Sequence, residues 1–454
     1  MRRQLRSRAA TGAVLIGIAG LALTAAAGGV APGTAWSRIS GGPTQATAAG
    51  GQLGLARTAD GTLNVIWNRG TGPTSIFDTR ISSDGTIRGT TTVASGWAGN
   101  GGLALLVLPD KTLRLFAAGM SNAHAASGGI NMLSAPAGGG SWTLVPNAVW
   151  GGATANAAAY LGATLTSTGE IVTSWPDYFH VGLDPTSAPT LIHPDMASSP
   201  LATDHATGAV VTAGITIAGS GGAFVRQVLP SAGPSLLLAS ATQERSTGLA
   251  ARVGAPGVYI SYATLNGQAV RLARYGGTTQ TVARGSGLVT AKVFAGPGGR
   301  LWVAWMVFRG TEIYATRSNE AVTAFEPVQM LTLPDPSTNQ GVSALQGEGS
   351  VGALDLFADM TIGTEAGFMH TRVLALFTLK ASVGGPAKGQ KNAPVSLSLR
   401  DAGDPVSAAT IVVAGKHLKT NSKGLATLPL APGSYTASAT ATGYATTSIP
   451  FTVR

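Results

Sequence analysis

One short pattern recurs seven times along the chain and limits the fold more than any other feature. Each copy is a turn followed by alternating or continuous apolar residues, and copies start about 48 residues apart, the length of one four-stranded propeller blade. The copies are DGTLNVIW at 60, DKTLRLFA at 110, TGEIVTSW at 168, TGAVVTAG at 207, APGVYISY at 255, GGRLWVAW at 298 and VGALDLFA at 351. Because a four-stranded unit cannot bury both faces alone, we expect the units to stack radially around an axis. The repeat predicts a seven-bladed β-propeller, and six or eight blades would also fit if the long interval after 110 holds an irregular unit.

The composition favours an all-β chain. Of 454 residues, 44% are hydrophobic and 11% are charged, and the 63 Gly and 24 Pro interrupt most windows of helical length. There is no Cys, so packing and strand pairing must stabilise the fold without disulfides. Trp67, Trp175 and Trp305 fall at the same position of their repeats, which indicates that these rings pack between blades.

The start of the chain predicts export. Residues 1–27 have the three regions of a secretory signal peptide, which are four Arg, an apolar stretch and small residues ending at Ala27. We expect cleavage near Ala27 and a secreted protein, with an uncleaved membrane anchor as the alternative. Without those four Arg the formal charge of +10 falls to +6, and the remaining basic residues are scattered along the sequence. No basic stripe for nucleic acid is visible, whereas association with an anionic cell envelope or cell wall fits the charge.

A change in composition divides the rest of the chain. After an N-terminal segment at 28–44, the repeats occupy 45–380. The Gly-, Pro- and Lys-rich run at 381–390 is the clearest linker. Short alternating strands with closely spaced turns then fill 391–454 and predict a small β-sandwich.

This C-terminal segment resembles the carboxypeptidase regulatory-like domain, a transthyretin-like sandwich often appended to secreted bacterial proteins. The resemblance rests on ATIVVAG, the turn at Gly424, the Pro432-Gly433 turn and the run SYTASATATGY. It implies that Tyr435 and Tyr444 are core aromatics. It also implies a spacer or binding accessory without catalytic residues.

Residues 45–380 resemble secreted bacterial β-propellers, in particular the sialidase-like ones, through their periodicity. The sialidase Asp-box is not matched, because in SSDGTIRG at 82 Gly85 follows Asp84 directly and the aromatic is missing. The Asp-Gly pairs at 60 and 84 instead predict tight hairpin turns, in which Gly supplies a positive φ. The resemblance therefore implies a fold and not a reaction.

Titratable side chains concentrate between 175 and 205. The candidate catalytic residues are Asp177, His180 and Glu170. A glycosidase needs two carboxylates on either side of the bond it cleaves, so carboxylates of different blades, including Asp355 and Asp359, would have to converge at one mouth of the ring.

The same region supplies candidate metal ligands, since His and carboxylate bind zinc and hard cations. They are His193, Asp195, Asp204 and His205. Their spacing matches no recognised ligand motif, and the Asp residues fit turn initiators equally well. No cofactor is expected.

Five aromatic residues lie outside the repeated strand position and are candidates for a ligand-binding surface, with buried packing as the alternative. They are Trp97, Trp142, Trp150, Tyr178 and Phe179. The leading hypothesis is a secreted, non-catalytic recognition or scaffold protein that binds a glycan or a cell-envelope protein through propeller loops. The alternatives are a sialidase-like hydrolase or lyase with carboxylates at the propeller mouth, and a purely structural role. We expect no nucleic-acid partner and no stable membrane insertion after signal cleavage.

Overall fold

The computed structural model of the chain describes residues 35–40, 52–69, 74–97, 99–120, 129–136, 138–150, 160–193, 200–216, 222–239, 247–264, 267–307, 310–335 and 337–454. Regular structure in these ranges consists of β-strands and one short 3-10 turn, η3 (Pro297–Gly299). Within the same ranges no helix has the length and apolar character needed to cross a membrane. The predicted signal peptide and Asp195 lie outside the described residues.

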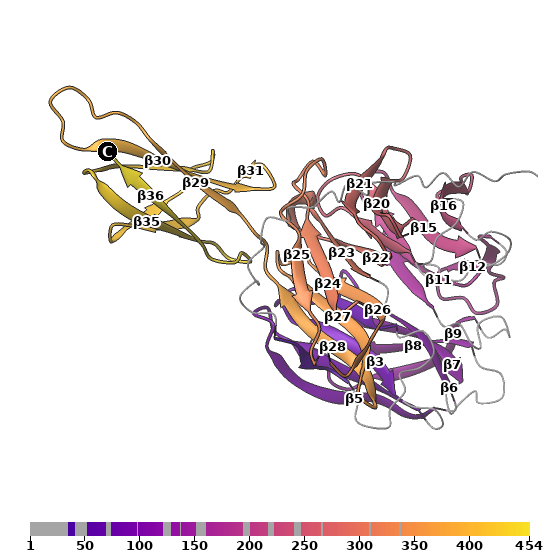
Figure 1. Cartoon of the computed structure of the whole chain (residues 1–454). Coiled ribbons are helices and arrows are strands. Elements are labelled where there is room, and N and C mark those ends of the chain that lie inside the picture. Colours follow the sequence, from indigo (N-terminus) through magenta and orange to yellow (C-terminus); the bar gives the residue numbers. More distant parts are fainter. Residues whose placement is uncertain are drawn as a thin grey trace, which may run out of the picture.

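Strands between Ser37 and Val373 form seven four-stranded antiparallel sheets within the described residues, here called blades 1 to 7 in chain order (Figure 1). Blades 1 to 3 contain β2 (Gly54–Arg57), β3 (Leu63–Arg69), β4 (Thr74–Ile81), β5 (Ile87–Trp97), β6 (Gly99–Val107), β7 (Leu113–Met120), β8 (Gly129–Ala135), β9 (Thr143–Trp150), β10 (Gly162–Leu165), β11 (Ile171–Trp175), β12 (Tyr178–Val181) and β13 (Thr190–Leu191). Blades 4 to 6 contain β14 (Leu201–Asp204), β15 (Ala209–Thr216), β16 (Gly222–Leu229), β17 (Leu236–Ala239), β18 (Gly248–Ala251), β19 (Val258–Ala263), β20 (Ala269–Arg274), β21 (Thr279–Arg284), β22 (Leu288–Ala295), β23 (Leu301–Val307), β24 (Glu312–Arg317) and β25 (Gln329–Thr332).

Blade 7 joins the two ends of the repeat region. It contains β26 (Asn339–Glu348), β27 (Leu354–Ile362) and β28 (Glu365–Val373), with β1 (Ser37–Arg38) as its fourth strand. Ser37 pairs with His370, and an ion pair joins Arg38 to Glu365 at 2.9 Å. The inner strands β2, β6, β10, β14, β18, β22 and β26 contact one another in this order, and β26 also contacts β2. These contacts close a ring, so the prediction of an all-β propeller is confirmed.

The recurrent tryptophans are buried, as the repeat predicted. Each lies on the second strand of its blade and packs against a ring on the third strand, with centroids 4.5 to 6.2 Å apart. The pairs are Trp67–Phe77, Trp175–Tyr178 and Trp305–Tyr314. Each Trp also belongs to a core cluster that includes residues of the preceding blade or, for blade 1, of blade 7. The same side chain therefore stabilises its own blade and the contact with the preceding one.

Two glycines let neighbouring inner strands approach closely. A Cβ on Gly102 would lie 2.6 Å from the backbone nitrogen of Leu161, and a Cβ on Gly248 would lie 2.5 Å from that of Val293. Both nitrogens belong to the following blade. Because any side chain would collide with backbone there, the packing of the ring requires glycine at these positions.

The C-terminal residues form two further sheets that pack face to face (Figure 1). One sheet contains β29 (Thr378–Val383), β30 (Ala393–Asp401), β31 (Asp404–Pro405) and β34 (Leu425–Leu430). The other contains β32 (Thr410–Val413), β33 (Lys416–Lys419), β35 (Gly433–Thr440) and β36 (Thr447–Val453). Alternate residues of both sheets meet in one apolar core, and Gly424 takes the predicted turn with φ +68°.

The linker expected at 381–390 is not a linker in the structure. β29 pairs with β30 from Thr378 to Val383, and Phe377 and Leu379 lie in the core of the sandwich. The Gly-, Pro- and Lys-rich run that follows is the exposed hairpin between these two strands. The alternation of apolar residues before 381 belongs to the sandwich, and the turn-forming composition marks a hairpin loop within it.

The propeller and the sandwich are joined by a short, firmly held segment. Only four residues separate β28 from β29, and hydrogen bonds fix three of them. The Leu374 carbonyl accepts from Gln329 at 2.9 Å, the Ala375 amide donates to Gly443 at 3.0 Å, and the Leu376 amide donates to Glu326 at 2.8 Å. Figure 1 shows the sandwich projecting from the side of the ring formed by blades 6 and 7.

A buried ionic network, here called the junction network, lies at this contact. Its centre is Arg317, which is 1% exposed and donates to Asp401 at 2.6 Å and to Glu326 at 3.2 Å. Tyr444 donates to the same Asp401 oxygen at 2.7 Å, and its ring lies 4.8 Å from the Arg317 guanidinium. Arg300 extends the network through an ion pair with Asp404 at 2.7 Å.

Burial dominates the electrostatics of the junction network. It raises the pKa of Glu326 well above the usual carboxyl value, although Arg317 acts in the opposite direction. It also raises the pKa of Tyr444 to about 12. Loss of solvation disfavours the charged form of both groups more than the neighbouring guanidinium favours it.

Candidate functional site

A cavity of about 820 Å³ lies where the inner strands of blades 3 to 7 end. Each of these strands pairs with a single neighbour, so its other edge is turned toward the ring axis. Backbone N–H and C=O groups along such an edge are available to a ligand. The volume falls within the range of roughly 300 to 1,000 Å³ that small-molecule sites occupy.

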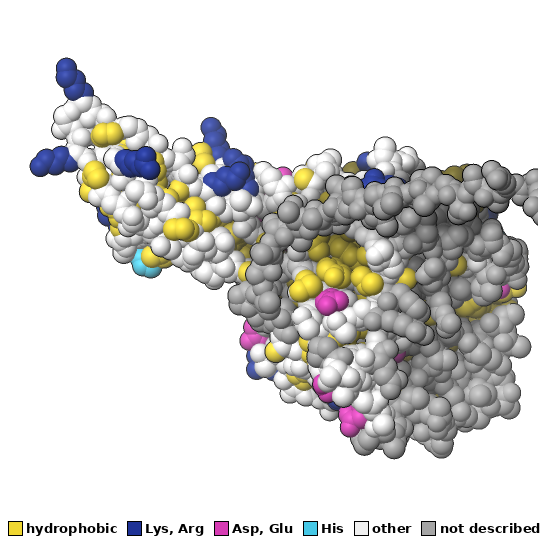
Figure 2. Space-filling model, viewed as in Figure 1, with side chains coloured by type: hydrophobic (Ala, Val, Ile, Leu, Met, Phe, Trp, Pro, Cys, Tyr) yellow, Lys and Arg dark blue, Asp and Glu magenta, His cyan; other side chains and the backbone are white. Residues whose placement is uncertain are grey.

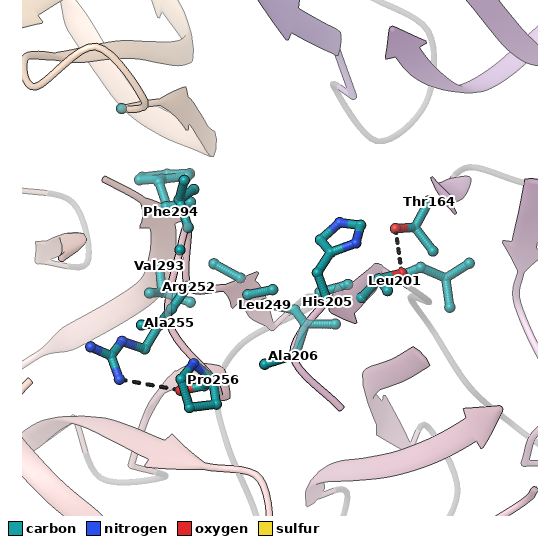
Figure 3. Close-up of a pocket in the computed structure, with 18 of the residues that line it drawn as sticks. Thr164, Leu201, His205, Ala206, Leu249, Arg252, Ala255, Pro256, Val293 and Phe294 are labelled. Atoms are coloured by element: carbon teal, nitrogen blue, oxygen red, sulfur yellow. Dashed lines mark hydrogen bonds between the residues drawn. The ribbon is translucent and has the colours of Figure 1, made fainter. Parts of the chain in front are cut away.

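Ala and Gly make up nearly half of the described lining residues and leave the strand edges accessible. They are Ala202, Ala206, Ala250, Ala251, Ala255, Ala295, Gly254, Gly347 and Gly349. Two rings stand out against them, the exposed imidazole of His205 and the half-buried ring of Phe294. Figure 3 shows both rings facing the same open space, His205 from the end of β14 and Phe294 from β22. A Cβ on Gly347 would lie 3.2 Å from the Phe294 ring, so the glycine makes room for it.

The two charged side chains of the wall are bound within the protein. The Arg252 guanidinium donates to the carbonyls of Gly299 at 2.8 Å and Pro256 at 3.2 Å, and also to that of Glu320. The Glu348 carboxylate accepts from Arg57 at 2.5 Å and from the Ser350 amide at 2.7 Å. The wall therefore presents polar and apolar groups but little uncompensated charge.

Glu348 also belongs to a second buried ionic network, here called the closure network, between blades 1 and 7. Its centre is Asp355 on β27, which is fully buried. This carboxylate contacts Arg57 on β2, accepts from His370 on β28 at 3.0 Å and pairs with Arg372 at 3.4 Å. Three cationic or hydrogen-bonding groups thus converge on one carboxylate at the point where the ring closes.

The candidate catalytic residues do not meet at the cavity. Glu170 is exposed in the turn before β11, and Asp177 follows that strand in a left-handed conformation with φ +73°. His180 is buried and shares a hydrogen bond of 2.7 Å with Ser187. Asp355 is held in the closure network, and Asp359 accepts from Ser343 at 2.7 Å. None of these residues lines the cavity, so the predicted carboxylate pair is not assembled there.

The candidate metal ligands also separate. His193 stacks on Phe224 with centroids 4.9 Å apart. The Asp204 carboxylate accepts from the Ala206 amide at 3.0 Å and from the Gly257 amide of the next blade at 2.9 Å, so it fixes a turn and an inter-blade contact. Among the described residues no three His, Asp or Glu side chains are grouped in a way that could hold a metal ion. Of the candidates that the structure describes, His205 alone lines the cavity.

The predicted aromatic surface is not formed, because its members serve the cores of different blades. Trp97 is 2% exposed and Phe179 is 6% exposed. Trp142 is half-buried against the core of blades 1 and 2, and Trp150 and Tyr178 pack in the same way between blades 2 and 3. The ring that does face the cavity, Phe294, lies in the apolar run VTAKVFA, where no local signal distinguishes it from core residues.

Comparison with known proteins identifies no family. No protein-family model matches the chain, and no curated protein matches it. Among solved structures, the BP39L lectin from Burkholderia pseudomallei is similar, with 11% identity, a TM-score of 0.49, and coverage of 70% of this chain and 98% of that one. The polysaccharide lyase Uly1 has 10% identity, a TM-score of 0.43, and coverage of 71% and 89%. The Hadza microbial sialidase Hz136 has 13% identity, a TM-score of 0.40, and coverage of 72% and 65%. Similarity of this degree transfers neither a ligand nor a reaction to this chain.

Proposed function

We propose that the protein is an exported, non-catalytic recognition protein that binds a neutral, hydroxyl-rich glycan in the central cavity of the propeller. The observation that carries the proposal is the cavity itself. Its strand edges are accessible, two rings face the same open space, and its charged side chains are paired within the protein. The sequence of residues 1–27 supports export. The proposed binding place is the cavity and not the exposed aromatic surface that the sequence suggested.

A sugar fits the chemistry of the wall. The strand edges offer hydrogen-bond donors and acceptors that match hydroxyl groups. The Phe294 ring offers an apolar surface for the C–H face of a pyranose, and the His205 imidazole offers one further hydrogen bond. Because Arg252 and Glu348 are bound within the protein, a charged ligand gains less from the described part of the wall than a neutral one.

The same wall argues against hydrolysis. A glycosidase needs two carboxylates placed on either side of the reacting bond. Glu348 is the one carboxylate among the described lining residues, and Arg57 holds it in an ion pair. A hydrolase or lyase is nevertheless the rival that the experiment must separate from simple binding.

The test uses one variant that fills the cavity and one matched control. Ala206 is exposed and lines the cavity, whereas Ala188 is also exposed but does not line it. The wild-type protein is screened against neutral and acidic oligosaccharides, and affinity for the best ligand is measured by titration calorimetry. We expect Ala206→Trp to weaken binding by at least roughly tenfold and Ala188→Trp to leave it unchanged.

Mass spectrometry of the recovered sugar decides between recognition and turnover. Intact sugar is expected. Shortened or unsaturated products would overturn the non-catalytic proposal. If Ala206→Trp bound the sugar with unchanged affinity, the cavity would not be the binding site. Failure of the protein to retain any sugar in the screen would contradict glycan recognition altogether.

A further inference from the structure

The net charge of the protein is concentrated in the sandwich. Residues 377–454 contain eight Lys and Arg but only two Asp and Glu, a net charge of +6. Residues 35–376 contain 18 of each kind and are neutral. The two acidic residues of the sandwich, Asp401 and Asp404, pair with arginines of the propeller in the junction network. Within the described residues 377–454, no ion pair therefore joins a cation of the sandwich to an acidic residue of its own domain.

Strand alternation places part of this charge on one flat face. Residues on β29 and β30 alternate between the core and the outer face of their sheet. The pairing sets Lys380 opposite Ser398 and Thr378 opposite Arg400, so the two cations lie diagonally across neighbouring strands. Hydroxyl side chains fill most other outward positions of the sheet, and these are Thr378, Ser382, Ser396, Ser398 and Thr427.

Further cations surround this face. Exposed Lys388 and Lys391 lie in the hairpin between β29 and β30, and exposed Lys423 lies in the turn before β34. Lys416 and Lys419 lie on β33, which contacts β34. Figure 2 shows Lys and Arg side chains spread over the sandwich, whereas carboxylates appear at the junction and on the propeller.

We propose that the outer face of β29, β30 and β34 binds an acidic polysaccharide. Extended strands present an elongated, flat surface that an extended polymer can follow. The cations attract repeated carboxylate or sulfate groups, and the hydroxyls can bond to sugar hydroxyls between them.

Other polyanions fit this face less well. The outward positions of β29, β30 and β34 carry no aromatic side chain, so nucleic-acid bases have no ring on which to stack. The outward side chains of β29, β30 and β34 are hydroxyls, cations, two prolines and the half-buried Leu425, and one leucine is too little apolar surface to hold the face in a bilayer.

The experiment compares two charge-reversal variants of the full chain. Lys380→Glu with Lys423→Glu changes the sandwich, and Arg88→Glu with Arg284→Glu makes the same change of net charge at exposed positions of the propeller. Polygalacturonate is the carboxylate probe, dextran sulfate the sulfate probe and dextran the uncharged control. Binding is measured by interferometry at low and at high salt.

We expect at least one acidic polysaccharide to bind at low salt and to dissociate at high salt, since the attraction is exposed and screened. The sandwich variant should lose roughly tenfold in affinity and the propeller variant less than about twofold. Preference between the two acidic probes identifies the anionic group.

Several results would overturn the proposal. They are an equal loss in both variants, no binding to either acidic probe, stronger binding to duplex DNA or to phosphatidylglycerol vesicles, and binding of the Ala206→Trp protein to dextran as strong as to the acidic probes. Ala206→Trp should leave polymer binding intact. The outcome is therefore independent of whether the cavity binds a neutral sugar.

Discussion

The two buried ionic networks of this protein are built in opposite ways. In the closure network one carboxylate, Asp355, receives Arg57, His370 and Arg372. In the junction network one guanidinium, Arg317, receives Glu326 and Asp401. The first joins blade 1 to blade 7 and so completes a single fold. The second joins two units, each of which has its own apolar core.

This difference indicates what each network does. Without the closure network the ring would open between its first and last blades, and the core of every blade depends on its neighbours. Without the junction network the sandwich would separate, but its own core and the ring would remain. A carboxylate at the centre of one network and a guanidinium at the centre of the other also predict different responses to a neutral substitution and to pH.

The largest effect is expected at the centre of the closure network. Asp355→Asn keeps the shape of the side chain but leaves His370 and Arg372 without their carboxylate and Arg57 with Glu348 alone. We expect a loss of about 3 to 5 kcal/mol in the free energy of unfolding of the propeller, measured by chemical denaturation. The matched control is Asp84→Asn, because Asp84 is exposed in a hairpin turn, and it should change stability little. Equal stability of the two variants would show that the closure network does not hold the ring.

A smaller and more local effect is expected at the junction. Arg317→Met leaves Glu326 buried without its cation and Asp401 with only the longer ion pair to Arg300 at 3.5 Å, which should cost about 3 kcal/mol of docking free energy. Calorimetry should then show the sandwich melting separately from a propeller whose transition is unchanged. Residues 374–377 should also become accessible to proteases.

A second substitution tests why Arg317→Met should weaken docking of the sandwich. If unpaired carboxylate charge is responsible, adding Glu326→Gln to Arg317→Met should restore part of the docking stability. A double variant as unstable as the single one would contradict that explanation. If Arg317→Met also abolished the propeller transition, the junction network would stabilise the ring as well, and the two networks would not differ in this respect.

The architecture could be predicted from the sequence because its signals are local. A hairpin turn followed by an alternating strand recurs seven times, and Trp67, Trp175 and Trp305 mark one position of that unit. The extent of the sandwich was harder to predict. The strand from Thr378 to Val383 is followed by a hairpin whose composition is the same as that of a linker.

The candidate site could not be predicted because it is assembled from distant strands. The cavity takes one short segment from each of five blades, and only His205 was among the candidate residues. Arg57 and Asp355 are 298 residues apart, and Arg317 and Asp401 are 84 apart, so no spacing motif can reveal either pair. The cations of the sandwich are scattered along residues 377–454, and only strand pairing brings Lys380 and Arg400 together on one face.

The smallest predicted effect is a pH dependence of sandwich docking that arises from Glu326 in the junction network. Burial raises the folded-state pKa of Glu326 above its ordinary value of 4.5, so folding takes up a proton at this group above that pH. Its contribution to stability is therefore fully present below about pH 4.5 and declines as the pH rises toward the raised value. Docking of the sandwich should weaken over this interval, which calorimetry of its transition at a series of pH values would measure.

Glu326→Gln provides the control, because the amide has the shape of the protonated acid and does not titrate. The sandwich transition of this variant should lose the part of the pH dependence that the wild-type protein shows above pH 4.5. Parallel curves for the two proteins would mean that Arg317 keeps Glu326 ionised in the folded state. In that case Glu326 and Arg317 would form a charged pair, as Asp355 and Arg57 do in the closure network.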